Sequence, residues 1–142
     1  MESIYLTEVK ELGPEVGEFL QAGYLILFEI GAPPELAEMS VLHQPVFRRE
    51  APPATGDVLA IGSREFRITA VGDKAWKNIQ DLGHAVFVFN GAAEVEMPGQ
   101  ICLEEQGVED LGEAVQPGTR LEIKAGAETT TAVDRERTTR ES

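Results

Sequence analysis

Short apolar runs of strand length recur along the chain between turns that contain glycine or proline. The run from Tyr24 to Ile30 is almost continuously apolar and predicts a strand buried on both faces. The runs 57–61 and 65–71 flank Gly62, which predicts a hairpin whose tight turn uses the glycine. Further strand candidates bring the total to about eight, and they cover residues 4–9, 41–47, 84–89, 100–104 and 120–124.

One of these candidates, 41–47, contains Pro45. Proline has no N–H to donate to a neighbouring strand, so it is confined to edge strands, strand ends and bulges. We therefore expect an edge or an irregularity near this position.

Helical patterns are fewer than strand patterns. Residues 73–83 carry an apolar stripe at helical spacing, with Asp73 as the expected N-cap and Gly83 as the terminating residue. Pro14 predicts the first turn of a short helix that ends near Gly23, and a weaker pattern covers 34–39. Many short strands with two or three short helices predict an all-β or mainly β fold, a small closed or nearly closed β-barrel.

The composition changes near the C-terminal end. From Gly126 to Ser142 the chain is polar and rich in threonine, with only Ala127, Ala132 and Val133 apolar. So little apolar surface cannot offset the entropy lost on ordering the segment. The sequence therefore predicts one folded domain over residues 1–125 and a disordered tail over 126–142.

The 142 residues include 25 acidic and 12 basic side chains, a formal net charge of −13. Such a surface repels nucleic acids and anionic membranes, so we expect neither as a partner. No apolar run approaches the roughly 20 residues of a membrane span, and Met1 to Ile4 lack the features of a signal peptide. These observations predict a cytoplasmic protein with no direct membrane insertion.

Few side chains can act as nucleophiles or metal ligands, because His43, His84 and Cys102 are the only histidines and cysteine. Cys102 lies between apolar residues with no basic neighbour, which predicts an inert strand residue. The adjacent pair Arg48 and Arg49 could receive a phosphate or form a solvated strand end. Neither a glycine-rich nucleotide-binding motif nor a serine nucleophile motif is present.

Each histidine allows a functional and a structural interpretation. By strand alternation His43 shares a face with Val41, Pro45 and Phe47, where a largely neutral imidazole is nucleophilic if exposed and merely structural if buried. His84 follows a helix end, where it could bind a phosphoryl group, orient a second histidine or simply be hydrogen-bonded. A metal site at the two histidines would need carboxylate ligands that no spacing indicates.

Several short strings can be matched together to a known family. They are TAVG at 69–72, NIQDLGH at 78–84, FNG at 89–91 and MPG at 97–99, preceded by GAPPELAE at 31–38 and LH at 42–43. In their joint spacing they resemble the IIA component of the glucitol/sorbitol-specific sugar phosphotransferase system (PTS). The resemblance covers about residues 1–125.

The resemblance implies a phosphotransferase component with a phosphohistidine intermediate at His43. The phosphocarrier protein HPr would donate the phosphoryl group to Nε2, and the cysteine of the membrane transporter's IIB component would receive it for glucitol/sorbitol uptake by IIB and IIC. Family members can carry a second histidine where this chain has Pro45, so an auxiliary role would pass to His84 or to backbone amides. The resemblance implies no metal or other cofactor.

Phosphoryl transfer between imidazoles depends on in-line geometry, so we expect an accessible His43 ring within a shallow apolar surface that includes Met39, Val41 and Phe47. The acidic domain should attract a donor with a positive face. Unpaired edge strands would also allow a homodimer. Two alternatives stay open: a regulatory phosphohistidine interaction module, and a small-ligand or metal-binding barrel without phosphotransfer.

Overall fold

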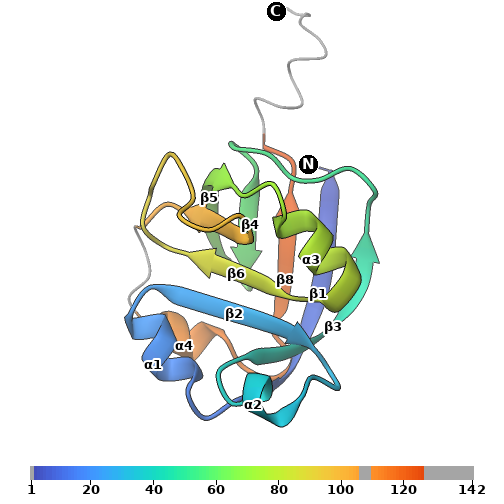
Figure 1. Cartoon of the computed structure of the whole chain (residues 1–142), viewed down its shortest axis with the longest axis vertical. Coiled ribbons are helices and arrows are strands. Elements are labelled where there is room, and N and C mark those ends of the chain that lie inside the picture. The colour runs from blue at the N-terminus through green and yellow to red at the C-terminus, as the bar shows by residue number, and fades with distance from the viewer. Residues whose placement is uncertain (1, 106–109, 127–142) are drawn as a thin grey trace, which may run out of the picture.

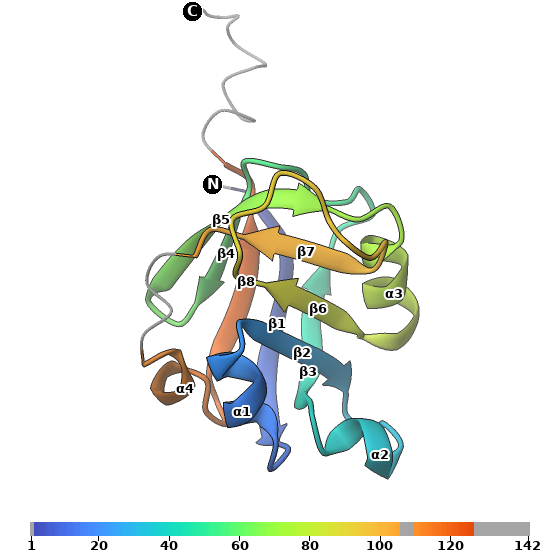
Figure 2. The same cartoon turned by 60° about the vertical axis from the view of Figure 1, so that its left-hand side comes forward.

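Eight strands close into a barrel in a computed structural model that describes residues 2–105 and 110–126 (Figures 1 and 2). Around the barrel their order is β1-β3-β2-β6-β7-β5-β4-β8. The strands are β1 (Ser3–Leu12), β2 (Tyr24–Glu29), β3 (Val41–Arg48), β4 (Val58–Ile61), β5 (Arg64–Val71), β6 (Ala85–Val88), β7 (Gln100–Leu103) and β8 (Arg120–Lys124). The described residues thus confirm the predicted mainly β barrel.

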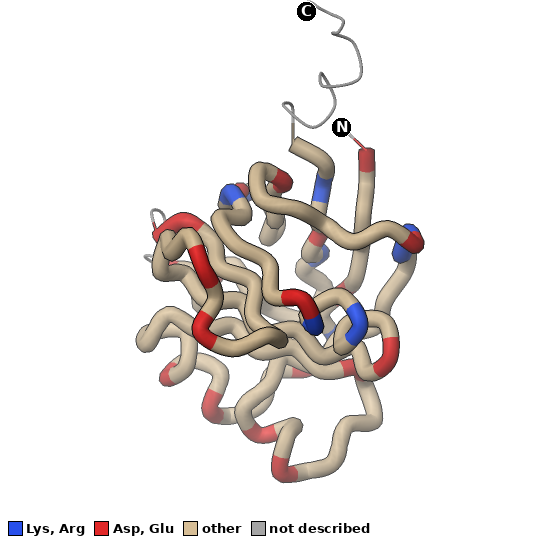
Figure 3. The backbone as a smooth tube through the Cα atoms, turned by 45° about the horizontal axis from the view of Figure 1, so that its top comes forward, with Lys and Arg blue, Asp and Glu red and all other residues tan. Residues whose placement is uncertain are grey.

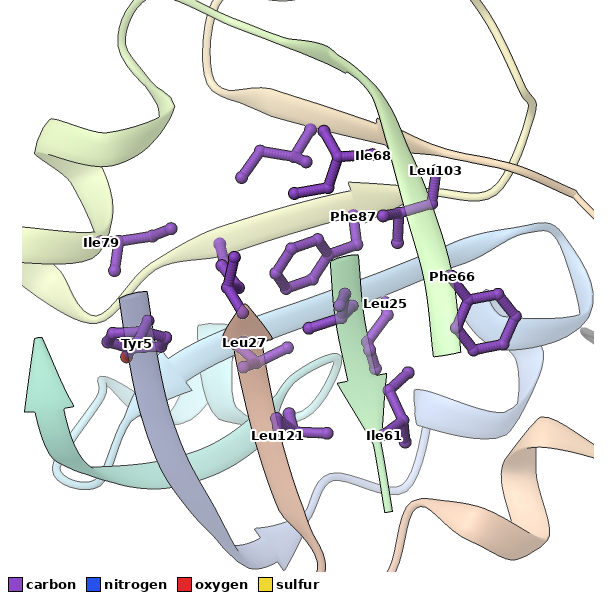
Figure 4. Close-up of a cluster of buried hydrophobic side chains, with 14 of the residues drawn as sticks. Tyr5, Leu25, Leu27, Ile61, Phe66, Ile68, Ile79, Phe87, Leu103 and Leu121 are labelled. Carbon is purple, nitrogen blue, oxygen red and sulfur yellow. The ribbon is translucent and has the colours of Figure 1, made fainter. Parts of the chain in front are cut away.

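Apolar side chains from the strands fill the barrel interior (Figure 4). Alternate residues of a strand point to opposite faces, and in β5 Phe66 and Ile68 are buried while Glu65 and Arg67 are exposed. Fully burying an aliphatic or aromatic side chain of this size contributes about 1.5–3 kcal/mol. The interior is therefore a packed core, and a polar side chain inside it needs hydrogen-bond partners.

An irregularity interrupts the pairing of β1 with β3 next to Pro45. Leu6 pairs with Phe47 and Thr7 pairs with Pro45, so Val46 has no opposite residue and its side chain is exposed. This arrangement is a β-bulge, one of the positions that tolerate proline in a sheet. The expectation at Pro45 is confirmed, and the bulge ends the strict alternation that begins at Val41.

Two strand pairs are parallel, β2 with β3 and β6 with β7. Parallel neighbours need a crossover connection, because a tight hairpin joins only antiparallel strands. The connection between β2 and β3 contains α2 (Pro34–Ala37), and β6 is joined to β7 by the loop 89–99. The helix α3 (Ala75–Leu82) lies between β5 and β6. In both views α3 lies beside the start of β6 (Figures 1 and 2).

The helices differ from the sequence prediction in two details. The N-cap of α3 is Lys74 without a side-chain cap hydrogen bond, so Asp73 is not the capping residue. Besides α1 (Val16–Gln21), α2 and α3, the described part contains α4 (Leu111–Ala114), which the pattern did not predict. Leu111 is the one fully buried residue of this single turn, too little for a helical stripe to be visible in the sequence.

Closure gives every strand two neighbours within the described chain, with β8 pairing both β1 and β4. The homodimer expectation rested on open edges, and the closed barrel removes that reason for it. Of the predicted tail, Gly126 donates its N–H to Asp57 Oδ1 at 2.9 Å, and 127–142 lie outside the described residues.

Acidic positions are spread over the backbone, and Lys and Arg occupy fewer places (Figure 3). Among the described residues, no helix has the length and apolar character needed to cross a membrane.

Candidate functional site

His43 lies inside the barrel, on the part of β3 that precedes the bulge. It pairs with Val9 of β1 on one side and with Glu29 of β2 on the other. Its side chain has 0% exposure. The expected accessible ring is therefore wrong for this conformation, because the face that His43 shares with Val41 points into the core.

Both ring nitrogens of His43 have hydrogen-bond partners. Nε2 lies 2.7 Å from the carbonyl oxygen of Gly83, and Nδ1 lies 2.5 Å from Oγ1 of Thr7. A carbonyl oxygen only accepts, so Nε2 carries a proton. In a neutral ring Nδ1 then accepts from the Thr7 hydroxyl, which fixes the tautomer.

The buried environment favours this neutral ring. Burial lowers the pKa of His43 from its ordinary value, while the Gly83 carbonyl and the charge of Glu29 oppose that change. Removing a charged imidazolium from water costs more than removing a neutral ring, which is why burial has this sign. The ring therefore retains one nitrogen lone pair at neutral pH.

Gly83 can reach His43 because it lacks a side chain. It ends α3 in the left-handed conformation, with φ of 64°, where its N–H still bonds to Ile79. A Cβ at this position would lie 2.7 Å from Cβ of Glu29, closer than two carbons can approach. Glycine thus lets the end of α3 lie against β2 and direct its carbonyl to the ring.

Aromatic side chains and polar contacts hold α3 over this end of the barrel. The Tyr5 ring is edge-on to both His43 and Trp76, with centroids 6.4 and 5.9 Å away. Trp76 Nε1 donates to the Glu50 carbonyl at 3.0 Å, and Arg48 donates to the Gln80 carbonyl at 3.3 Å. These contacts hold the first turn of α3 through Trp76 and its last turn through Gln80.

His84 occupies a different environment from His43. Its ring stacks on Phe28, with centroids 4.1 Å apart, and Nδ1 lies 3.3 Å from the Leu27 carbonyl. Phe28 alternates with the core residue Leu27 along β2, so the stack is on the outer face of the barrel. Among the residues that the structure describes, no hydrogen bond or ring contact joins His43 and His84.

The apolar surface near the site is built from residues other than those expected. Val41 is in the core, and Phe47 follows the bulge, where 46% of it is exposed. Beside Gly83, Ile30 and Leu82 are 47% and 56% exposed. They line a pocket of about 470 Å³ together with Phe28, Glu29, Gly31, Ala32, Pro33, Leu36 and Asp81.

The contacts of the other candidate residues, Cys102 and Arg49, are structural. Cys102 is fully buried in β7, and burial raises the pKa of its thiol, as expected for a strand residue in the core. Arg49 pairs with Glu2 at 3.2 Å and donates to the carbonyls of Ala51 and Pro52. Within residues 2–105 and 110–126, no three His, Cys, Asp or Glu side chains gather to hold a metal ion.

Sequence reasoning did not identify Thr7, the Gly83 carbonyl or Tyr5 as parts of the site. Thr7 is 36 positions before His43, and its contact depends on the register of β1 against β3. One signal was available: Tyr5, Thr7 and Val9 alternate along the first strand, which places two polar hydroxyls on its inward face.

Comparisons with known proteins point to one family. The model of the family "PTS system glucitol/sorbitol-specific IIA component" matches residues 4–122. The chain is 30% identical over 126 residues to the PTS system glucitol/sorbitol-specific EIIA components of Shigella flexneri and Escherichia coli strain K12. In both cases the match covers 88% of this chain and 98% of the relative.

A solved structure has the same fold. The crystal structure of a PTS system IIA component from Enterococcus faecalis V583 superimposes with a TM-score of 0.67 at 24% identity. The match covers 84% of this chain and 99% of the solved chain.

Proposed function

Because the chain belongs to the glucitol/sorbitol-specific IIA component family of the PTS, we propose that it is a cytoplasmic phosphocarrier that receives a phosphoryl group on His43. HPr is the donor, and the cysteine of a IIB component is the acceptor. The names of the relatives, glucitol/sorbitol-specific EIIA components, support glucitol/sorbitol as the sugar that this route takes up.

The observation that best supports His43 as the nucleophile is its neutral ring, held at both nitrogens. An imidazole attacks phosphorus through a nitrogen lone pair, which the charged form lacks. Thr7 and Gly83 also fix the ring's orientation, and phosphoryl transfer depends chiefly on orientation and charge stabilisation. His84 has an auxiliary role, because the contact of its Nδ1 with the Leu27 carbonyl anchors the chain directly after Gly83 to β2.

The proposed transfer requires the contact between Nε2 and the Gly83 carbonyl to open, because the ring is fully buried. Nε2 must also give up its proton, with the ring's single proton then on Nδ1, before the Nε2 lone pair forms a bond to the phosphorus carried by HPr. The phosphorus–nitrogen bond in HPr breaks, and its electron pair returns to the HPr imidazole. The next transfer repeats this exchange with the IIB cysteine thiolate as nucleophile and His43 as leaving group.

The surface beside Gly83 is suited to a partner with an apolar centre and a positive rim. Ile30 and Leu82 provide exposed apolar area, and the pocket they line includes Glu29 and Asp81. We place HPr at this surface, where docking against Leu82 acts directly on the end of α3 that covers His43.

Phosphorylation by labelled phosphoenolpyruvate, enzyme I and HPr tests the proposal. We expect the wild type to take up an acid-labile, alkali-stable label, His43→Gln to take up none, and His84→Gln to retain most of it. Failure of the wild type to label would sink the proposal, and a labelled His43→Gln would move the nucleophile elsewhere.

Transfer of the label to a purified IIB component tests the second half of the route. Passage to its cysteine supports a role in transport. A stable label that does not pass to IIB would support the regulatory phosphohistidine module instead.

A further inference from the structure

The Tyr5 hydroxyl is a buried polar group without a hydrogen-bond partner of acceptable geometry among the described residues. Tyr5 is 3% exposed, and it alternates on the inward face of β1 with Thr7, the residue that contacts His43. Burial raises the pKa of Tyr5 to about 12, and the neighbouring Thr7 hydroxyl and Arg48 oppose that rise. An unpaired buried hydroxyl costs free energy, so its presence beside a reactive residue calls for an explanation.

The tautomer in the structure is not the one that attacks through Nε2. Here Nε2 holds the ring proton for Gly83, and Nδ1 accepts from Thr7. For Nε2 to offer a lone pair, the single proton of the neutral ring has to be on Nδ1. Nδ1 then donates to Thr7 Oγ1, and the Thr7 hydroxyl has to turn its own proton to another acceptor.

We infer that Thr7 and Tyr5 form a hydroxyl relay that selects the nucleophilic tautomer of His43, with the Tyr5 oxygen accepting the Thr7 proton when Nδ1 is protonated. The inference rests on the proposed function, because it concerns how the same histidine becomes reactive. Thr7 and Tyr5 are positioning residues in this arrangement, since both act through the ring.

Protons and bonds balance in this exchange. When the Gly83 contact opens, Nε2 loses its proton to water and Nδ1 gains one from water, so the ring stays neutral. Thr7 keeps its proton and only rotates about its C–O bond. The new chain runs from Nδ1–H to Thr7 Oγ1 and from the Thr7 hydroxyl to Tyr5, which leaves the Nε2 lone pair directed at the opening.

Tyr5→Phe is the sharpest test, because among the described residues the Tyr5 hydroxyl has no hydrogen-bond partner of acceptable geometry in the resting state. We expect the variant to be as stable as the wild type or more so, with unchanged ¹⁵N shifts for the resting His43 ring. Its phosphorylation by HPr should be roughly three- to tenfold slower, the effect of losing about one hydrogen bond in the reactive state. Tyr24→Phe, at the start of β2, is the matched control and should phosphorylate at the wild-type rate.

Thr7 provides an independent pair of variants. Thr7→Val keeps the shape of the side chain but removes the hydroxyl, so we expect slower phosphorylation than in Tyr5→Phe and an altered ¹⁵N shift at Nδ1. Thr7→Ser restores the hydroxyl and should recover most of the rate. Loss of packing alone would not give this recovery together with the change at Nδ1.

Three results would overturn the relay. A wild-type rate in Tyr5→Phe, with His43 still required for labelling, would remove the relay and leave the phosphocarrier intact. A resting ¹⁵N spectrum with the proton on Nδ1 would do the same. A wild type that takes up no label would overturn the proposed function and the relay together.

Discussion

His43 combines the proposed reactive ring with a position in the barrel core. The ring is neutral, oriented at both nitrogens and excluded from water. Exclusion protects a reactive nitrogen from chance partners, and the cost is that the charged form of the ring becomes unfavourable. Protonation of His43 is therefore coupled to the stability of the whole barrel.

This coupling predicts a loss of stability in mild acid. Because burial lowers the pKa of His43, the unfolded chain binds a proton more readily than the folded protein. The contribution of the neutral ring is fully present above the unfolded pKa of about 6.5 and is lost as the pH falls through the lower folded pKa. The slope can reach about 1.4 kcal/mol per pH unit for one group.

Urea unfolding at two pH values, about 7.5 and about 5.5, measures the effect. We expect the wild type to lose more free energy of unfolding between them than His43→Gln does. Equal losses in the two proteins would show that His43 does not carry this pH dependence.

The sequence indicates His43 as a candidate but not its surroundings. Its strand, its neutral ring and its place on the same face as Val41 follow from alternation and from ordinary imidazole chemistry. The burial of His43 does not follow from the sequence, because it depends on which face of the strand closes into the barrel. Thr7 and Gly83 come from β1 and from the end of α3, and only tertiary pairing brings them to the ring.

At the scale of elements, the end of α3 is the cover over the site. Its last turn leads into Gly83, whose carbonyl binds Nε2. The Trp76 side chain donates to the Glu50 carbonyl, and Arg48 donates to the backbone carbonyl of Gln80. The strand pattern and this helix were readable from the sequence, because several apolar positions repeat at a fixed period in each. Pro45 indicated an irregularity near the bulge without fixing its type, and the single turn of α4 was not predicted, since it leaves no periodic signal.

Gly83→Ala should disturb this cover more than an equivalent substitution elsewhere. Gly91 is the matched control, because both glycines have φ of 64° but a Cβ at Gly91 would meet Glu105 only at an ordinary 3.7 Å. Each substitution bears the strain of a left-handed alanine, about 1 kcal/mol, and only Gly83→Ala also clashes with Glu29.

Urea unfolding and the ¹⁵N spectrum of His43 report the result. We expect Gly83→Ala to lose about 1–3 kcal/mol more than Gly91→Ala and to weaken the Nε2 hydrogen bond. Equal destabilisation with an unchanged ring spectrum would contradict the role given to Gly83.

For the molecule as a whole, the uneven charge distribution shapes encounters with partners. Residues 11–47 contain six glutamates and no lysine or arginine, and they include β2, α2 and most of the pocket beside Gly83. A local acidic field of this kind accelerates association with a positive partner, and added salt screens it.

Two charge reversals separate a local field from net charge. Glu35→Lys, on α2 near the pocket, and Glu94→Lys, in the connection between β6 and β7, change the net charge equally. We expect Glu35→Lys to slow association with HPr roughly threefold or more at low salt, and Glu94→Lys to change it little. Stopped-flow association rates measure this, and rates independent of salt in the wild type would exclude electrostatic steering.

The closure of β1 against β8 also sets the order in which this molecule can be made. Ser3 pairs with Lys124, and β8 lies between β1 and β4, so the ring of strands cannot close until the ribosome has produced residue 124. Until then the nascent chain has two open edges, at β1 and at β4. The closed barrel that surrounds His43 is therefore complete only after its last strand has been made.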